Sequence, residues 1–226
     1  MRVIDFRVGD YQKILEQQTM LFQNLVTSKR EHKDSEESIL IGEHPAVITL
    51  GRKAKENNII SSQQSLKEKR IGVYHIGRGG DVTFHCPGQL VVYPILDLEK
   101  HGLGVKDYVS ILEESVIRLL HKHGIKGERV ENATGVWIGK GTKNERKISA
   151  IGIKCSRFCT MHGISLNVNN DLQGFSLINP CGFTDKGVTS MEMEGVKVDI
   201  NEVKKEFLAL FLSFIFPLEE VLDFSE

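Results

Sequence analysis

The sequence predicts an α+β fold in which helices surround a mixed or antiparallel sheet. Short apolar runs typical of strands gather in the middle of the chain, and apolar residues recur at helical spacing before, between and after them. With 226 residues the chain can bury a sizeable core, and we take residues 1–226 as one domain. Apolar residues make up 40% and charged residues 26%, a globular composition that favours neither disorder nor a membrane protein.

The first half of the chain begins with a short strand and an amphipathic helix. This helix begins at Tyr11, and its apolar residues recur at helical spacing as far as Leu25. Residues 29–38 are a charged run, which predicts a solvated loop. Further along, strands are expected at residues 38–41, 47–50, 72–76 and 90–96, with a polar connection at residues 57–70.

The second half of the chain also combines helices and short strands. Apolar residues at helical spacing predict a second amphipathic helix over residues 105–120, and Gly124 stands where a helix stop is favoured. The last helix opens near Asp199 and runs to about Phe216; its most apolar part is shorter than the ~20 residues of a membrane span, so it should face the core. Short strands are expected between these helices, at residues 135–138, 148–153 and 164–168.

Charge and cysteine content narrow the partners and the compartment. The formal net charge of -1 argues against a nucleic-acid-binding surface. The amino terminus lacks the pattern of a secretory signal, and four cysteines are too few for a disulfide scaffold. We therefore expect a cytoplasmic protein with free thiols that binds neither nucleic acid nor membrane.

A glycine-rich segment, residues 78–89, lies between two predicted strands and includes Thr83, His85 and Arg78. Glycines let a backbone turn tightly or approach a ligand, so this segment could bind an oxygen-rich group or form only a tight turn. It matches neither the phosphate loop nor the dinucleotide-binding fingerprint. No nucleotide cofactor is therefore expected.

Three residues have the spacing of metal ligands. Cys155 and Cys159 are separated by three residues, and His162 follows, but no fourth ligand is apparent for a structural zinc site. Both cysteines are more typical of small core residues. We expect no metal.

Cys181 differs from the other cysteines because Pro180 and Gly182 flank it. These neighbours favour a turn that presents the side chain, and a thiol whose pKa is lowered by a nearby cation is an effective nucleophile. Lys147, Lys154 and His162 are the candidate cations on the preceding strands. A buried structural cysteine is the competing interpretation.

Several segments together resemble the lipoyl(octanoyl) transferase family. The matching segments are residues 43–45, 49–52, 78–85, 87–89, 93–94, 97–98, 135–137, 147–152, 162–163, 166–168 and 177–182. This resemblance implies the fold of biotin and lipoate protein ligases, a central mixed sheet flanked by helices. It also implies octanoyl transfer from octanoyl-acyl carrier protein to the lipoyl-domain lysine of 2-oxoacid dehydrogenase complexes and of the glycine cleavage H protein.

The resemblance assigns roles to particular residues. Cys181 would carry the acyl thioester, and Lys147 would lower its thiol pKa and shuttle protons. Because an ordinary lysine pKa suits a base poorly, we predict that burial lowers the pKa of Lys147. The implied substrate contacts are Arg78, Gly79, Gly80, Asp81, Val82, Thr83, Phe84, His85, Ala150, Ile151, Gly152, Gly163, Ile164 and Ser165.

Finer expectations follow from this assignment. The backbone N–H groups of Gly79 and Gly80, or those of residues 150–152, are candidates for the oxyanion hole. Ile151 and Val168 are candidates for lining the acyl pocket. Cys86 stands where the family usually has glycine, so a positive φ at that position would strain the backbone and place a second thiol near the site. We expect a monomer that needs no cofactor.

Three rival functions remain. An ATP-dependent lipoate or biotin ligase on the same fold would not need Cys181. A non-catalytic protein that only binds carrier or lipoyl domains would leave this thiol inert. A papain-like hydrolase could pair Cys181 with His162 or His85, although no protease signature surrounds the cysteine.

Overall fold

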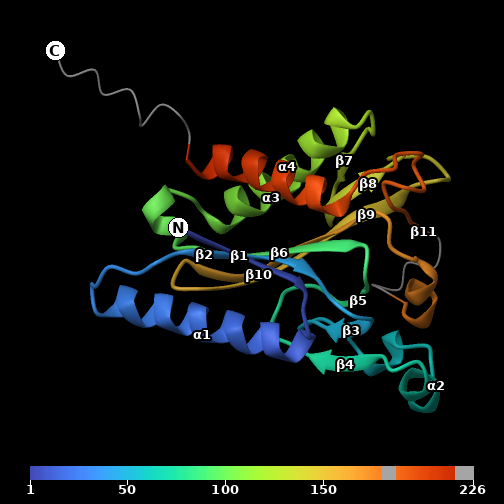
Figure 1. The fold of residues 1–226 in the computed structure, drawn as a ribbon, viewed down its shortest axis with the longest axis horizontal. Coiled ribbons are helices and arrows are strands. Elements are labelled where there is room, and N and C mark those ends of the chain that lie inside the picture. Colours follow the sequence, from blue (N-terminus) through green and yellow to red (C-terminus); the bar gives the residue numbers. More distant parts are fainter. Residues whose placement is uncertain (180–186, 217–226) are drawn as a thin grey trace.

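The computed structural model describes residues 1–179 and 187–216. Its centre is a large sheet, with helix α1 (Tyr11–Arg30) along one face and helices α3 (Val105–Lys122) and α4 (Ile200–Ile215) along the other (Figure 1). The predicted α+β class and the central sheet flanked by helices are confirmed. Cys181 lies outside the described residues.

The large sheet is mixed. In spatial order its strands are β1 (Arg2–Val8), β2 (Ser38–Glu43), β6 (Gln89–Ile95), β10 (Cys159–Asn167), β9 (Arg146–Ser156), β8 (Ala133–Ile138) and β7 (Glu128–Val130), and β11 (Gly187–Val188) also pairs with β9. The pairs β1–β2 and β9–β11 are parallel, and the pairs among β2, β6, β10, β9, β8 and β7 are antiparallel. This order places the motif-bearing strands β6, β10 and β9 in the middle.

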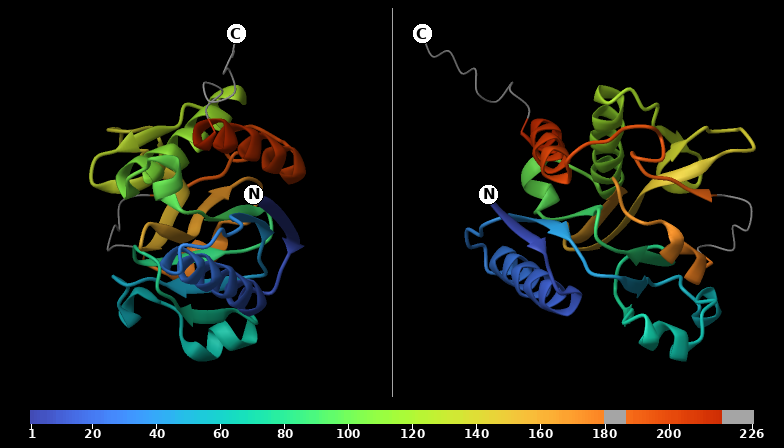
Figure 2. Two further views of the ribbon diagram at one scale, coloured as in Figure 1. Left: turned by 90° about the vertical axis from the view of Figure 1, so that its left-hand side faces the viewer. Right: turned by 45° about the vertical axis from the view of Figure 1, so that its right-hand side comes forward.

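A smaller sheet lies beside the large one, at the same end as the short helix α2 (Gln63–Glu68) (Figure 2). Its order is β4 (Gly72–His75), β3 (Val47–Leu50) and β5 (Val82–His85), with β3 parallel to β4 and antiparallel to β5. Leu66 of α2 is buried in the core of this sheet, with Ile48 and Leu50. The glycine-rich segment thus starts in the loop that enters β5.

Two cores hold the helices to the large sheet. Phe207 and Phe211 of α4 and Tyr108 of α3 are fully buried against one face. On the other face, Phe22 and Leu25 of α1 are buried against β6 and β10. Each such side chain contributes roughly 1.5–3 kcal/mol on burial, so these helical faces fix the helices on the sheet.

The helix ends agree with the sequence. The side chain of Asp199 accepts a hydrogen bond from the Asn201 backbone N–H at the start of α4. Gly124 has a φ of 75° and follows α3 closely, as a glycine helix stop does. Within residues 1–179 and 187–216, no helix has both the length and the apolar character of a membrane span.

Several predicted boundaries are wrong. Helix α2 lies in the expected connection, β5 lies within the glycine-rich segment, and α1 continues into the expected loop. Strands β9 and β10 are longer than expected because they form a hairpin in which Ser156 pairs with Cys159. Its two turn residues, Arg157 and Phe158, have φ values of 50° and 60°, and they lack the Asn-Gly pattern that announces such a turn. Short 3₁₀ helices also occur at Glu56–Asn58, Leu98–His101 and Gln173–Leu177.

Candidate active site

A cavity of about 440 Å³ is lined by residues of both sheets. The predicted site residues that line it are Arg78, Gly80, Asp81, Val82, Thr83, His85, Lys147, Ala150, Ile151, Gly152, Gly163, Ile164 and Ser165. Its volume is in the range of small-molecule sites. The fold therefore gathers segments that are far apart in the chain around one space.

Gly79 and Phe84 are not among the residues that line the cavity. Because side chains alternate along a strand, Phe84 faces the opposite side of β5 from Thr83 and His85. Its ring packs on that of Phe175 in the small core, with 5.7 Å between ring centroids. Val168 also lies away from the cavity, in the core of the large sheet, so its expected role as a liner is wrong.

The loop that carries Arg78 and Gly79 packs directly against strand β9. The Gly79 N–H donates to the Ile153 carbonyl with an N···O distance of 2.7 Å. A Cβ atom on Gly152 would lie 2.8 Å from the Gly79 carbonyl oxygen, so only glycine allows this approach. The proposal of Gly79 as an oxyanion-hole donor is contradicted, because its N–H is already bonded.

Arg78 is buried in the wall of the cavity. Its Nη2 atom donates to the carbonyl and hydroxyl oxygens of Thr49 at 2.8 and 2.9 Å, and its Nη1 atom donates to the Gly79 carbonyl at 3.0 Å. These bonds orient the guanidinium and join β3 to the loop before β5. A fixed cation beside the cavity favours a substrate with polar oxygen atoms.

Two histidines line the cavity, and both are buried. Burial lowers the pKa of His85 to about 3 and that of His162 to about 3, so both rings are neutral near pH 7. The Nδ1 of His85 lies 2.6 Å from Oε1 of Gln89, whose Nε2 donates to Asn167 at 2.9 Å. This amide therefore presents its oxygen to the ring, and His85 donates.

Lys147 lies on β9, half-buried, and lines the same cavity. Its Nζ donates to the Thr134 carbonyl at 3.2 Å and lies 4.6 Å from the ring centroid of Trp137. Carbonyl oxygens and aromatic faces both attract an ammonium. The expected lowering of the Lys147 pKa stays a prediction.

Comparison with known proteins identifies the family. Residues 12–212 match a sequence model of the lipoyl protein ligase A/B catalytic domain. An octanoyltransferase of Bacteroides fragilis is 50% identical over 214 residues, which cover 92% of this chain and 97% of that protein. The chain belongs to the octanoyltransferase family. The resemblance inferred from the motifs is thereby confirmed, as is the expectation of an acyltransferase.

Two solved structures share the fold of this octanoyltransferase family member. A bipartite lipoate protein ligase of Thermoplasma acidophilum has a TM-score of 0.69 at 15% identity, covering 95% of this chain and 82% of that chain. A biotin protein ligase of Aquifex aeolicus has a TM-score of 0.58 at 17% identity, covering 97% of this chain and 72% of that chain. The expected relation to the ligase fold is confirmed.

The predicted nucleophile, Cys181, lies in residues 180–186, outside the described residues, but the residues that precede and follow this segment are described. Before it, the Asn179 N–H donates to the Asn58 carbonyl at 2.7 Å. The side chain of Asn58 donates in turn to Asp81 at 2.6 Å, and Asp81 lines the cavity. After it, Val188 pairs with Lys147 and lines the cavity.

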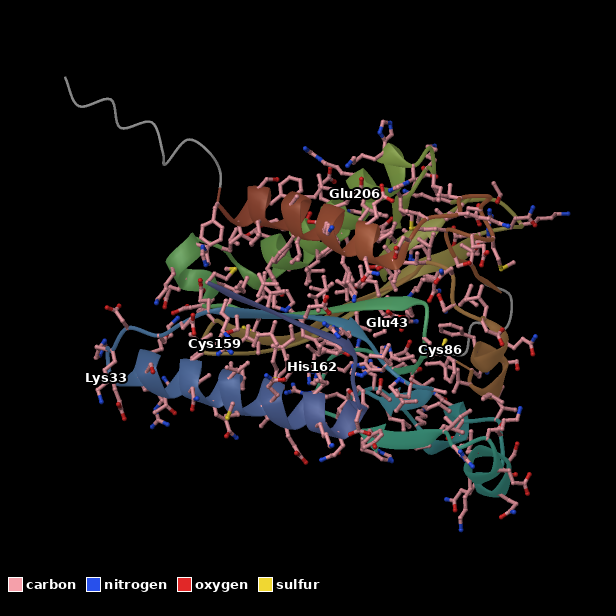
Figure 3. All side chains as sticks on the ribbon, in the orientation of Figure 1. Lys33, Glu43, Cys86, Cys159, His162 and Glu206 are labelled. Carbon is pink, nitrogen blue, oxygen red and sulfur yellow. The ribbon has the colours of Figure 1, made fainter. Side chains whose placement is uncertain are left out.

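Cys86 does not have the strained backbone that was expected. It is not among the residues of positive φ; Gly88 is, with a φ of 84°, and a Cβ there would lie 2.7 Å from Asn169 and Asn170 atoms. The Gly88 N–H donates to Glu43 at 2.7 Å, and Figure 3 labels Glu43 and Cys86 on this part of the molecule. Burial raises the pKa of the Cys86 thiol to about 11, so it is a poor nucleophile.

The cysteines considered for zinc lie in different surroundings. Cys159 is fully buried against α1, as expected for a core residue, whereas Cys155 packs against the core on the other face of the sheet. In the part of the chain that the structure describes, no group of three His, Cys, Asp or Glu side chains could hold a metal.

Sequence reasoning gave no role to several residues that line the cavity. These are Tyr11, Lys53, Ile76, Gln89, Tyr93, Asn132, Ala133, Thr134, Ile148, Asn167, Phe175 and Val188; His162, which was considered only as a cation, a metal ligand or a hydrolase base, also lines the cavity. Gln89, Tyr93 and Asn167 fall within matched motifs, so those motifs could have indicated them. Tyr11 carried no such signal, because at the start of an amphipathic helix it reads as an ordinary core residue.

Proposed function

We propose that this protein transfers an octanoyl group from octanoyl-acyl carrier protein, through a thioester on Cys181, to the lipoyl-domain lysine of lipoate-dependent enzymes. The acceptors would be the 2-oxoacid dehydrogenase complexes and the glycine cleavage H protein. The observation that carries the proposal is the gathering of Lys147 and nearly all implied substrate contacts around one cavity, in a chain that belongs to the octanoyltransferases.

In the first half-reaction, the Cys181 thiolate attacks the carbonyl carbon of the carrier thioester. A new C–S bond forms as the bond to the phosphopantetheine sulfur breaks, and the Lys147 ammonium protonates that leaving thiolate. One thioester replaces another, so the free-energy change is near zero and no ATP is needed. The Thr134 carbonyl and the Trp137 ring support this role because both lie against the Lys147 Nζ and can hold it in place.

In the second half-reaction, the lysine amine of the lipoyl domain attacks the acyl carbon on Cys181. An amide C–N bond forms, the C–S bond breaks, and neutral Lys147 takes the proton from the attacking amine. The thiolate is released for the next cycle. This step is downhill because an amide is more stable than a thioester.

The cavity suits an acyl chain with a polar carbonyl end. Ile151 and Ile164 provide apolar walls, and Arg78 provides a fixed cation. At ~0.8 kcal/mol per buried CH₂, an eight-carbon chain gains roughly 5 kcal/mol on burial. The neutral state of His85 and His162 supports this assignment because charged rings would oppose an apolar chain.

We extend the proposal to the domain organisation, the oligomeric state and the cellular compartment of the enzyme. Residues 1–226 act as one octanoyltransferase domain, supported by the contribution of both sheets to one cavity. It acts as a monomer in the cytoplasm. The free thiols of Cys86, Cys155 and Cys159 fit a reducing compartment.

The test is a transfer assay with octanoyl-acyl carrier protein and an isolated lipoyl domain, followed by the mass of the lipoyl domain. The wild type should octanoylate the domain without ATP, and Cys181→Ala should not. A Cys181→Ala variant that acylates the domain with free octanoate and ATP would identify a ligase. A wild type that binds the domain but modifies it under neither condition would identify a non-catalytic binding protein.

A further inference from the structure

Lys147 lies opposite Trp137 on the neighbouring strand only because the ladder is irregular there. Val136 pairs with Ser149, so a regular antiparallel ladder would pair Trp137 with Ile148. Instead the register shifts, and Trp137 pairs with Lys147. A one-residue shift moves a side chain to the other face of a sheet, so this bulge brings the Lys147 ammonium over the indole ring.

The indole ring is itself held in place. Trp137 is 2% exposed, and its Nε1–H donates to the Ala133 carbonyl at 2.8 Å. The ring therefore has little freedom to lose when a cation lies against it. A buried aromatic face attracts an ammonium more strongly than an exposed one.

The peptide unit between Thr134 and Gly135 also contacts Lys147. The Thr134 carbonyl accepts from Nζ at 3.2 Å, and the N–H of the same peptide, that of Gly135, donates to Oε1 of Glu113 at 3.0 Å. Hydrogen bonds in series polarise one another. The Glu113 carboxylate thus orients this peptide and increases the negative charge on the oxygen that faces the ammonium.

The Glu113 side chain is held in a fixed position beside the Thr134–Gly135 peptide. It lies on α3, is 9% exposed, and its Oε2 accepts from Nε of Arg129 at 3.0 Å. Gly135 has a φ of 120°, and a Cβ there would collide with the Ser149 carbonyl oxygen. Glycine is therefore required at the Gly135 end of the peptide bond that Glu113 holds.

We infer that Trp137 and Glu113 are positioning residues for Lys147: Trp137 through its ring face, and Glu113 through the Thr134–Gly135 peptide. Neither needs to touch the substrate. The inference rests on the proposed role of Lys147 and assigns what keeps its ammonium in place. The charged and titratable side chains that line the cavity with Lys147 are Tyr11, Lys53, Arg78, Asp81, His85, Tyr93 and His162. Those on the neighbouring elements are Glu113 with its partner Arg129, Glu128 opposite Trp137, and Arg146, next to Lys147 in the chain, with its partner Glu194.

The test compares Trp137→Leu, Trp137→Phe and Glu113→Gln with the wild type, each also in a Lys147→Met background. Two quantities are measured: the rate of octanoyl transfer and the pH midpoint of Cys181 alkylation by iodoacetamide. Glu114→Gln is the matched control, because Glu114 lies on the same helix and pairs with Arg129 and Arg118 but does not hold the Gly135 N–H.

Trp137→Leu and Glu113→Gln should each slow transfer by roughly tenfold and move the alkylation midpoint to higher pH. Trp137→Phe, which keeps a ring face, should recover most of the rate, and Glu114→Gln should behave as wild type. In the Lys147→Met background the same changes should have no further effect on either quantity, because their target is gone.

Two outcomes would overturn the inference. One is a wild-type rate and midpoint for both Trp137→Leu and Glu113→Gln. The other is an equal loss with and without Lys147, which would indicate a purely structural role. If Lys147→Met itself left transfer unchanged, the proposed function of Lys147 would fail first, and the inference with it.

Discussion

Two kinds of nitrogen base line the same cavity, and their surroundings differ. Lys147 has a carbonyl acceptor and an aromatic ring against its ammonium. His85 and His162 are buried so thoroughly that their pKa values fall to about 3. Histidine is the usual proton carrier near pH 7. Of these three side chains, only the lysine has surroundings that attract a cation, so the proposal of Lys147 as the proton carrier rests on its contacts rather than on residue type.

The largest expected effect comes from removing that lysine. Lys147→Met should lower the rate of octanoyl transfer roughly 10²- to 10⁴-fold, the usual loss when a general acid–base group is deleted. Stopped-assay kinetics at pH 7.5 would measure it. Lys143→Met, an exposed lysine in the turn before β9, is the control and should keep the wild-type rate. Equal transfer rates for Lys147→Met and Lys143→Met would show that Lys147 has no special role in the reaction, and its contrast with the two histidines would then have no functional meaning.

A smaller loss of transfer rate is expected when the neutral His162 is replaced. His162→Gln should lower the transfer rate by less than about tenfold, as for the loss of one packing or hydrogen-bonding contact. The same kinetic assay applies. A loss as large as that of Lys147→Met would instead support a cysteine–histidine pair of the hydrolase type.

The smallest effect concerns stability against acid. Burial lowers the pKa of His44 to about 4, below the usual 6.5 of an unfolded chain. The unfolded state therefore binds the proton first, and stability present above pH 6.5 is lost as the pH falls towards 4, at up to about 1.4 kcal/mol per pH unit. Urea unfolding at pH 7 and pH 5 should show a smaller loss for His44→Gln than for wild type.

His121→Gln is the control for the acid experiment, because His121 is exposed on α3. Its stability should depend on pH as in the wild type. An unchanged pH dependence in His44→Gln would show that His44 does not stay neutral in the folded protein.

The sequence predicted the three long helices and most of the segments that line the cavity, for physical reasons. Amphipathic spacing marks a helix that packs on one face, and Gly152 and Gly88 mark places where a side chain would collide. Both glycines lie within the motifs that resemble those of the family. The motifs therefore located the cavity walls without any knowledge of the sheet order.

Features that depend on strand register escaped prediction. The pairing of Trp137 with Lys147 arises from a bulge, and nothing in the local composition announces it. The Gly79 N–H looked available in a glycine-rich loop, but Ile153 on a distant strand accepts its hydrogen bond. Strand β7 and the β9–β10 turn were missed because they form through pairing with neighbouring strands, and their own residues carry no clear strand or turn pattern.

The most direct test of the account is the intact mass of the enzyme after incubation with octanoyl-acyl carrier protein and no acceptor. The account predicts one octanoyl adduct on the wild type, removed by neutral hydroxylamine, and none on Cys181→Ser. An unmodified wild type, or a hydroxylamine-labile adduct that persists in Cys181→Ser, would contradict the thioester on Cys181.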